Sequence, residues 1–169
     1  MSSRKTHDER KDLVGEHPLG DLGQLLLLFT FLAAWIIDSF VFSYSTFISE
    51  HIPLFAKIPL SVIILFSAAY LAKTGLSIVF GEIREEPSII KKGVFGIVRH
   101  PIYLGAILFY LGLLVLSFSI IAVAIWILIV AFYCFIAKHE EKLLLEEFGK
   151  DYEEYKKEVP MLIPRMRRK

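Results

Sequence analysis

Residues 101–137 read PIYLGAILFYLGLLVLSFSIIAVAIWILIVAFYCFIA, and this stretch decides the fold. It contains two long apolar runs, 101–116 and 120–137, separated only by Ser117-Phe118-Ser119. Each run approaches the length of about 20 residues that an apolar helix needs to cross the hydrocarbon core of a bilayer. Two helices joined by so short a turn must run antiparallel, side by side. The stretch therefore predicts a tight helical hairpin inside a membrane.

Two more apolar runs precede the hairpin, at residues 22–42 and 58–80. Hydrophobic residues make up 55% of the 169-residue chain, and its mean hydropathy is +0.57. A soluble domain of this size could not bury so much apolar surface, because small domains keep a large fraction of their surface in water. We therefore predict an all-α polytopic membrane protein with about four transmembrane helices. The length suggests a single membrane domain covering residues 1–169.

This domain divides into consecutive parts along the chain. They are an N-terminal segment (1–20), the first two spans (22–80), a loop, motif and hairpin (81–137) and a tail (138–169). Within the tail, apolar residues recur at three- and four-residue spacing among acids and lysines from His139 to Tyr155. This pattern predicts an amphipathic helix, broken or kinked near Gly149 and ended by Pro160 and Pro164.

The basic residues predict the orientation of the chain in the membrane. They gather before the first span, between the second and third spans, and after the fourth, whereas only Lys57 lies in the opposite loops. Loops rich in lysine and arginine stay on the cytoplasmic side. An even number of spans places all three basic segments on that side. We therefore expect a multi-pass protein with both termini in the cytoplasm.

Two charges lie inside predicted spans and are candidates for function, because charged groups are costly in lipid. Lys73 interrupts the second span, and Asp38 lies near the far end of the first. We expect Lys73 to extend its amino group to the basic face. We expect Asp38 to lie near the outer interface, at a depth too different from that of Lys73 for the two to pair.

Several kinds of site lack support in the sequence. The single Cys134 lies in an apolar run, so neither a disulfide framework nor a cysteine-based metal site is predicted. His7, His17 and His51 have no partner at metal-ligand spacing, and we predict no metal site. A glycine-rich phosphate loop after a strand and a Gly-x-Ser-x-Gly elbow are both absent. Basic residues interleaved with aromatics are missing from the soluble parts, so we expect no nucleic-acid partner.

The most reactive group of side chains lies at the start of the third span, in Arg99-His100-Pro101-Ile102-Tyr103. Proline suits the first turn of a helix, where its missing N–H costs nothing. The helix should therefore begin at Pro101, with Arg99, His100 and Tyr103 within one turn. Such a cluster offers a cation, an imidazole and a phenol. An ordinary interfacial belt of arginine and tyrosine remains the alternative reading.

Two acids, Glu140 and Glu141, follow the fourth span. They are typical of a solvated helix start, and they are equally suited to hold a cationic ligand. Because the third and fourth spans form a hairpin, their cytoplasmic ends must be neighbours. The hairpin therefore predicts that Glu140 lies close to His100, in a pocket suited to a zwitterion.

These residues are part of a longer ordered pattern. Its members are Gly93, Arg99-His100-Pro101, Tyr103, Gly105, Glu140-Glu141, Phe148-Gly149, Tyr152, Tyr155 and Val159-Pro160. The pattern resembles that of the isoprenylcysteine carboxyl methyltransferase and phospholipid methyltransferase superfamily, which are integral membrane enzymes. The first two spans resemble the superfamily only in character.

The resemblance implies a methyltransferase that uses S-adenosylmethionine, bound at the cytoplasmic ends of the last spans. It implies cofactor contacts from His100, Tyr103, Glu140, Ile90 and Phe95. Catalytic roles fall to two further residues. Arg99 would steer or polarise the methyl acceptor, and Glu141 (or His139) would act as base if the acceptor is an amine. The acceptor would be a membrane-embedded lipid-like or prenylated small molecule that enters from the bilayer.

The chain departs from the carboxyl-methylating relatives at three places. Residues 87–90 read Pro-Ser-Ile-Ile where those relatives have Gly-His-x-Leu-Val, and Phe95 replaces a tyrosine. Their substrate-binding arginine corresponds to Ile136. These differences weaken the expectation of a prenylcysteine carboxylate acceptor. Two alternatives stay open: a membrane reductase of the sterol-reductase type that uses NADPH, and a tetraspan protein without enzymatic activity.

The four-span topology is testable with single cysteines placed beside Lys91 and beside Glu50, after Cys134→Ser removes the native thiol. We expect a membrane-impermeant maleimide to label these two positions from opposite faces of sealed vesicles, because one full span separates them. Labelling of both positions from the same face would contradict the topology.

Overall fold

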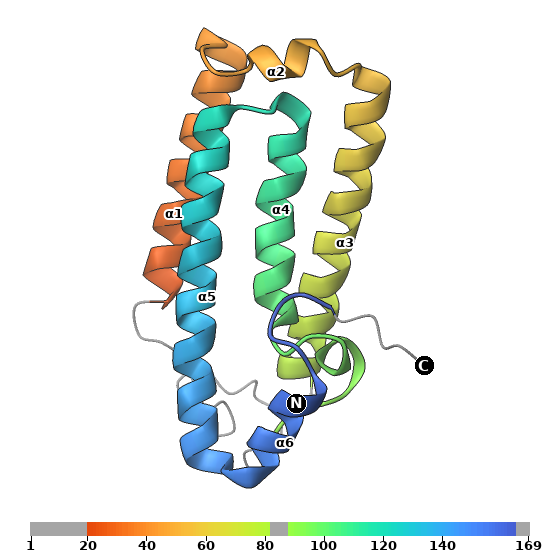
Figure 1. Cartoon of the computed structure of the whole chain (residues 1–169), viewed down its shortest axis with the longest axis vertical. Coiled ribbons are helices and arrows are strands. Elements are labelled where there is room, and N and C mark those ends of the chain that lie inside the picture. Colours follow the sequence, from red (N-terminus) through yellow and green to blue (C-terminus); the bar gives the residue numbers. More distant parts are fainter. Residues whose placement is uncertain (1–19, 82–87, 165–169) are drawn as a thin grey trace, which may run out of the picture.

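The computed structural model describes residues 20–81 and 88–164. Every regular element in these residues is a helix: α1 Gly20–Ile36, the π-helix η2 Ile37–Phe42, α2 Phe47–Glu50, α3 Leu54–Phe80, the 3-10 helix η3 Gly93–Gly96, α4 Pro101–Ser117, α5 Ile120–Phe148 and α6 Lys150–Glu158. Figure 1 shows the four long helices side by side along the length of the molecule, with α2 at one end and α6 at the other. The predicted all-α polytopic fold is confirmed.

Three helical stretches are long and apolar enough to cross a membrane: Leu22–Phe42, Leu54–Phe80 and Ile120–Phe148. The shorter apolar helix α4 has 17 residues. That length corresponds to about 26 Å of helix, against a hydrocarbon core of about 30 Å. The two ends of α4 therefore lie close to the boundaries of the hydrocarbon.

The helix bounds correct the sequence prediction at two places. Helix α3 begins at Leu54 rather than near Ile58, because it starts directly after Pro53 and accommodates Pro59. The amphipathic stretch after the predicted span 120–137 is not a separate helix at its start. Helix α5 continues unbroken to Phe148, since residues 138–148 contain neither glycine nor proline.

The predicted break at Gly149 is confirmed. Its φ of +51° lies in the region that favours glycine, and it separates α5 from α6. Predictions that rest on residues 1–19, 82–87 and 165–169 lie outside the described part of the chain.

Helices α3 and α4 approach each other closely because small residues face the contact. A Cβ atom on Gly105 would lie 3.0 Å from the Ala68 carbonyl oxygen. Nearer the end of the molecule that carries α2, which we call the outer end, the Ser61 hydroxyl donates a hydrogen bond of 2.7 Å to the Gly112 carbonyl oxygen. Small residues and interhelical hydrogen bonds are the usual means of joining helices in lipid, where apolar burial gives little driving force.

Larger side chains fill the space between α4, α5 and α1. The Trp126 indole donates to the Ile107 carbonyl oxygen at 3.0 Å, which joins the two arms of the hairpin. Phe31 of α1 is fully buried, and its ring lies 4.9 Å from that of Tyr110. Bulky aromatic rings therefore separate α4 from α5 and α1, whereas small residues let α4 pack closely against α3.

Asp38 fastens the outer end of α1 to the turn of the hairpin. It is only 4% exposed, and its carboxylate accepts hydrogen bonds from the Ser119 hydroxyl (2.5 Å), the Ser45 hydroxyl (2.5 Å) and the Ser45 N–H (3.0 Å). Asp38 lies in η2, near the far end of the first long helical stretch, as the sequence indicates. The sequence prediction did not anticipate this buried polar network.

The two lysines of the spans have different surroundings. Lys57 is 7% exposed, and its amino group donates to the Ser49 hydroxyl at 2.7 Å, which ties α3 to α2. Lys73 is exposed, as its predicted extension towards the basic face requires. No ion pair joins Asp38 to Lys73 within the described residues, because serines surround the carboxylate.

Replacing Asp38 should destabilise the protein without touching the inner end. We expect Asp38→Ala to lower the free energy of unfolding in detergent by about 2–3 kcal/mol, because it leaves buried hydroxyl and N–H groups without an acceptor. Ser39→Ala is the matched control. The Ser39 hydroxyl is buried without a hydrogen-bond partner among the described residues, so its removal should change stability by less than about 0.5 kcal/mol. Equal effects of the two substitutions would contradict the role of the network.

Candidate active site

We call the end of the molecule that carries α6 the inner end. There the start of α4 and the end of α5 bring together the residues that the sequence singled out. Helix α4 begins at Pro101, as predicted, and His100 occupies the N-cap position before it. The His100 side chain is 8% exposed and lies between two acids. Its Nδ1 is 3.5 Å from Glu140 Oε2, and its Nε2 is 3.3 Å from Glu141 Oε1. The predicted proximity of Glu140 to His100 is confirmed.

Tyr103 completes this cluster one turn into α4. Its hydroxyl donates a hydrogen bond to Glu140 Oε1. Its ring is parallel to that of His100, with centroids 5.5 Å apart, and lies 5.2 Å from the ring of Tyr133 on α5. We call His100, Tyr103 and Glu140 the inner cluster. It places an imidazole, a phenol and a carboxylate within contact of one another.

Arg99 and Glu141 form a buried ion pair beside the inner cluster. The Arg99 Nε donates to Glu141 Oε1 at 2.7 Å, and Nη2 lies 2.6 Å from the same oxygen. Their side chains are 8% and 7% exposed. The second carboxylate oxygen of Glu141 lies 3.3 Å from the Lys156 amino group. Helices α4, α5 and α6 therefore meet at one carboxylate.

Glu141 lies beyond the membrane-spanning part of α5. The predicted span covers residues 120–137, and the charged run that starts at Lys138 follows it. Burial by itself raises the pKa of Glu141. Hydrogen bonds from His100 and Arg99, together with the charge of Arg99, more than offset this effect and lower the pKa to about 2. A carboxylate with so low a pKa accepts a proton poorly near neutral pH, which favours a positioning role.

The segment after α6 folds back over the motif, and we call residues 159–162 the strap. Arg99 N–H donates to the Pro160 carbonyl oxygen at 2.9 Å, and His100 N–H donates to that of Met161 at 3.1 Å. The Arg99 guanidinium also donates to the carbonyl oxygens of Lys156 and Val159. In Figure 1 the strap is the dark blue loop that returns past the lower ends of α3 and α4.

Sequence reasoning missed the strap and the role of Lys156. The signal available was the apolar character of Val159, just before Pro160, and of Met161 and Leu162, between Pro160 and Pro164. Val159 and Leu162 are each 7% exposed. An apolar run in a polar tail indicates burial, and the prolines were read only as the end of the preceding helix.

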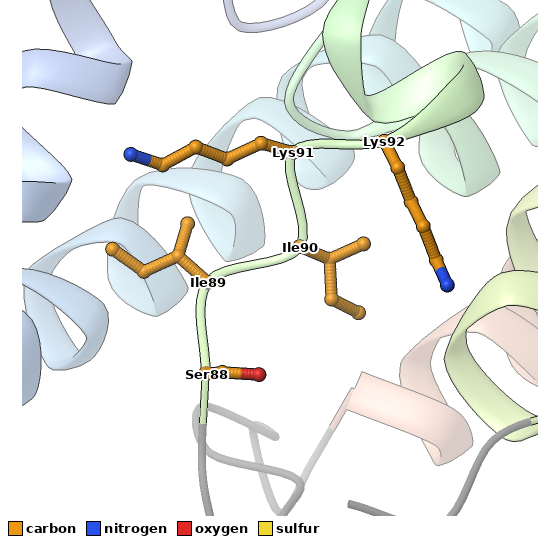
Figure 2. Close-up of a pocket in the computed structure, with 5 residues that line it drawn as sticks. All are labelled: Ser88, Ile89, Ile90, Lys91 and Lys92. Carbon is orange, nitrogen blue, oxygen red and sulfur yellow. The ribbon is translucent and has the colours of Figure 1, made fainter.

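The loop before the motif carries the two remaining cofactor candidates. Residues 88–92 line a pocket of about 450 Å³, which includes Ile90. Figure 2 shows Ile90 and Lys92 on one side of the backbone and Ile89 and Lys91 on the other. Ile89 packs against the buried residues of α6. The Phe95 carbonyl oxygen in η3 accepts a hydrogen bond from the Tyr155 hydroxyl at 2.7 Å.

The described residues contain no group of three His, Cys, Asp or Glu side chains arranged to hold a metal ion. The polar groups at the inner end are instead one carboxylate that contacts His100 and Tyr103, and a second one neutralised by Arg99. Such an arrangement suits an organic ligand with a cationic part.

A comparison with protein families identifies the chain. The sequence model of the phospholipid methyltransferase family matches residues 54–151. The chain belongs to this family. The match covers α3, the loop, the hairpin and the whole inner cluster, whereas α1 lies outside it. No curated protein matches the chain. The superfamily predicted from the ordered pattern is confirmed, and the protein is a membrane methyltransferase.

Loss of the Arg99 guanidinium should release the strap. We expect Arg99→Ala to lower the free energy of unfolding by about 3 kcal/mol, because the buried Glu141 then loses its guanidinium partner and keeps only the longer contacts to His100 and Lys156. Hydrogen exchange of the backbone amides at positions 99 and 100, which donate to the Pro160 and Met161 carbonyl oxygens, should accelerate at least tenfold. The control is Lys142→Ala, which breaks an exposed pair with Glu146 and should cost less than about 1 kcal/mol. Unchanged exchange in Arg99→Ala would contradict the assigned contacts.

Proposed function

We propose that this membrane methyltransferase uses S-adenosylmethionine to methylate a membrane-embedded lipid. The observation that carries the proposal is the inner cluster, in which Glu140 contacts both His100 and Tyr103 at the boundary of the hydrocarbon. We further propose that this boundary is the cytoplasmic one, as the basic residues predict. A water-soluble donor and a lipid acceptor can meet only at such a boundary.

The residues present suit this donor. When bound, S-adenosylmethionine supplies a methyl group on a positively charged sulfur, and it also carries an ammonium group. The Glu140 carboxylate would face a cationic part of the donor, and His100 and Tyr103 would hold that carboxylate in place. Ile90, on the wall of the loop pocket, offers an apolar surface for the uncharged part. The role of Phe95 as a further contact stays a prediction.

The ion pair of Arg99 and Glu141 serves positioning in this proposal. Each member is the chain neighbour of an inner-cluster residue, since Arg99 precedes His100 and Glu141 follows Glu140. The guanidinium is already bonded to Glu141 and to the carbonyl oxygens of Lys156 and Val159. These contacts favour Arg99 as the residue that holds the strap rather than one that touches the acceptor.

The proton balance depends on the acceptor. Methylation of a carboxylate forms an ester and releases no proton, whereas methylation of a protonated amine requires that one proton leave first. The low pKa of Glu141 makes it a weak base for that proton. His139, half-buried on the same helix, is then the better candidate for an amine acceptor.

A phospholipid-type acceptor is favoured over a prenylcysteine carboxylate. The family to which the chain belongs is described as phospholipid methyltransferase. Ile136, which stands where carboxyl-methylating relatives carry an arginine, is 2% exposed and supplies no charge for a carboxylate. An amine-bearing lipid headgroup requires no such cation.

Ligand binding tests the donor half of the proposal. In detergent, the purified protein should bind S-adenosylhomocysteine with a Kd on the order of micromolar. We expect His100→Ala and Glu140→Gln each to weaken binding at least tenfold. Glu146→Gln is the control, because Glu146 lies on the same helix with its side chain 63% exposed, and it should leave the Kd unchanged.

Other outcomes of this binding experiment point to the alternatives. Selective binding of NADPH would contradict the proposal and favour a reductase. Binding of neither ligand would favour a protein without enzymatic activity. Saturable S-adenosylhomocysteine binding that is indifferent to both substitutions would keep the class of enzyme and reject the assigned residues.

A further inference from the structure

A second pocket lies within the membrane-spanning helices, away from the loop. It is an open depression of about 270 Å³, lined by Gln24, Leu25, Leu28, Tyr110 and Tyr133. The first three residues belong to α1, Tyr110 belongs to α4 and Tyr133 to α5. We call it the α1 pocket. Because its walls are spanning helices, the medium at its mouth is the acyl-chain region of the bilayer.

The walls of the α1 pocket differ in character. Leu25 is 49% exposed and forms an apolar rim, whereas Tyr110 and Tyr133 are each 3% exposed and form the inner wall. The mouth of the pocket, at the exposed Leu25, therefore suits a hydrocarbon chain. The deeper part of the pocket presents the side chains of Gln24, Tyr110 and Tyr133.

The polar groups of the inner wall are incompletely paired. The Tyr133 hydroxyl donates to the Gln24 side-chain oxygen at 3.4 Å. Neither the Gln24 amide nitrogen nor the Tyr110 hydroxyl makes a hydrogen bond within the part of the chain that the structure describes. Donors left without acceptors in hydrocarbon are costly. Both groups can donate to one acceptor that enters the pocket.

The α1 pocket adjoins the inner cluster. The ring of Tyr133 lies 5.2 Å from the ring of Tyr103, whose hydroxyl bonds to Glu140. Tyr110 and Tyr103 lie on the same helix, about two turns apart. A lipid whose linkage region sits at Tyr110 therefore has its headgroup on the side of His100 and Glu140.

We propose that the α1 pocket binds the lipid acceptor of the methyl transfer, with an acyl-ester carbonyl between Gln24 and Tyr110 and the hydrocarbon chain at the leucine rim. This inference rests on the proposed function for the meaning of the headgroup position. An ester carbonyl fits because both free groups are donors and the surroundings are apolar. Helix α1 lies outside the family match, and it supplies three of the five residues that line the pocket.

The test is photo-crosslinking in vesicles. The probe is a diacyl phosphatidylethanolamine with a diazirine in one acyl chain, present at a low mole fraction in phosphatidylcholine vesicles that contain the protein. We expect crosslinks to be enriched at Leu25 and Leu28 over Leu26 and Phe29, which are 60% and 62% exposed on the same helix. Leu28→Trp should fill the pocket and reduce these crosslinks at least fivefold. Leu26→Trp, its matched control on α1, should leave them unchanged.

Uniform crosslinking along α1, or crosslinking at Leu25 that survives Leu28→Trp, would show contact with bulk lipid only and would overturn the proposal. Tyr110→Phe removes the hydroxyl and keeps the ring, so it should weaken enrichment without unfolding the protein. S-adenosylhomocysteine binding is measured on the same samples. We expect Leu28→Trp to change this affinity less than twofold while lowering methyl transfer to lipid at least tenfold.

The two proposals can fail separately. Absence of S-adenosylhomocysteine binding in the unaltered protein would refute the proposed function, and enriched crosslinking in that protein would still support a lipid site. Normal donor binding and methyl transfer in Leu28→Trp would reject the α1 pocket as the acceptor site and leave the methyltransferase intact.

Discussion

The inner end of the molecule depends on the buried ion pair between Arg99 and Glu141. A buried charge that loses its partner is strongly destabilising, so the pair constrains the ends of α4 and α5 to one separation. Arg99 extends the constraint to the end of α6 through backbone carbonyl oxygens. His100 and Glu140 are the chain neighbours of the two charges. The ion pair between Arg99 and Glu141 therefore fixes the positions of His100 and Glu140 as well.

The rest of the bundle keeps this pair where it is by two different kinds of packing. Gly105 and Ser61 allow α3 and α4 to approach closely, which gives one rigid unit. Between α4 and α5 the contacts are made by bulky rings such as Trp126. The family match covers both of these contacts. Helix α1 lies outside the matched residues, and it packs against the hairpin through Phe31 and Tyr110.

Features decided by neighbours along the chain could be predicted from the sequence. Pro101 indicated where a helix starts, and the short turn brought Glu140 close to His100. Features that join distant positions could not, because no spacing rule relates Asp38 to Ser119. The length of α5 was underestimated for another reason. Hydropathy marks where a helix leaves hydrocarbon, and a helix continues into water until a residue such as glycine interrupts it.

The strap has a consequence for the order in which the protein becomes active. Synthesis proceeds from the N-terminus, so the hairpin that carries the inner cluster is made before residues 159–162. Until those residues fold back, the N–H groups of Arg99 and His100 lack the carbonyl partners that they have in the finished fold. These contacts at Arg99 and His100 are therefore completed last, by residues made after the hairpin. In a chain newly inserted into the bilayer, docking of residues 159–162 is the last step that pairs these two N–H groups.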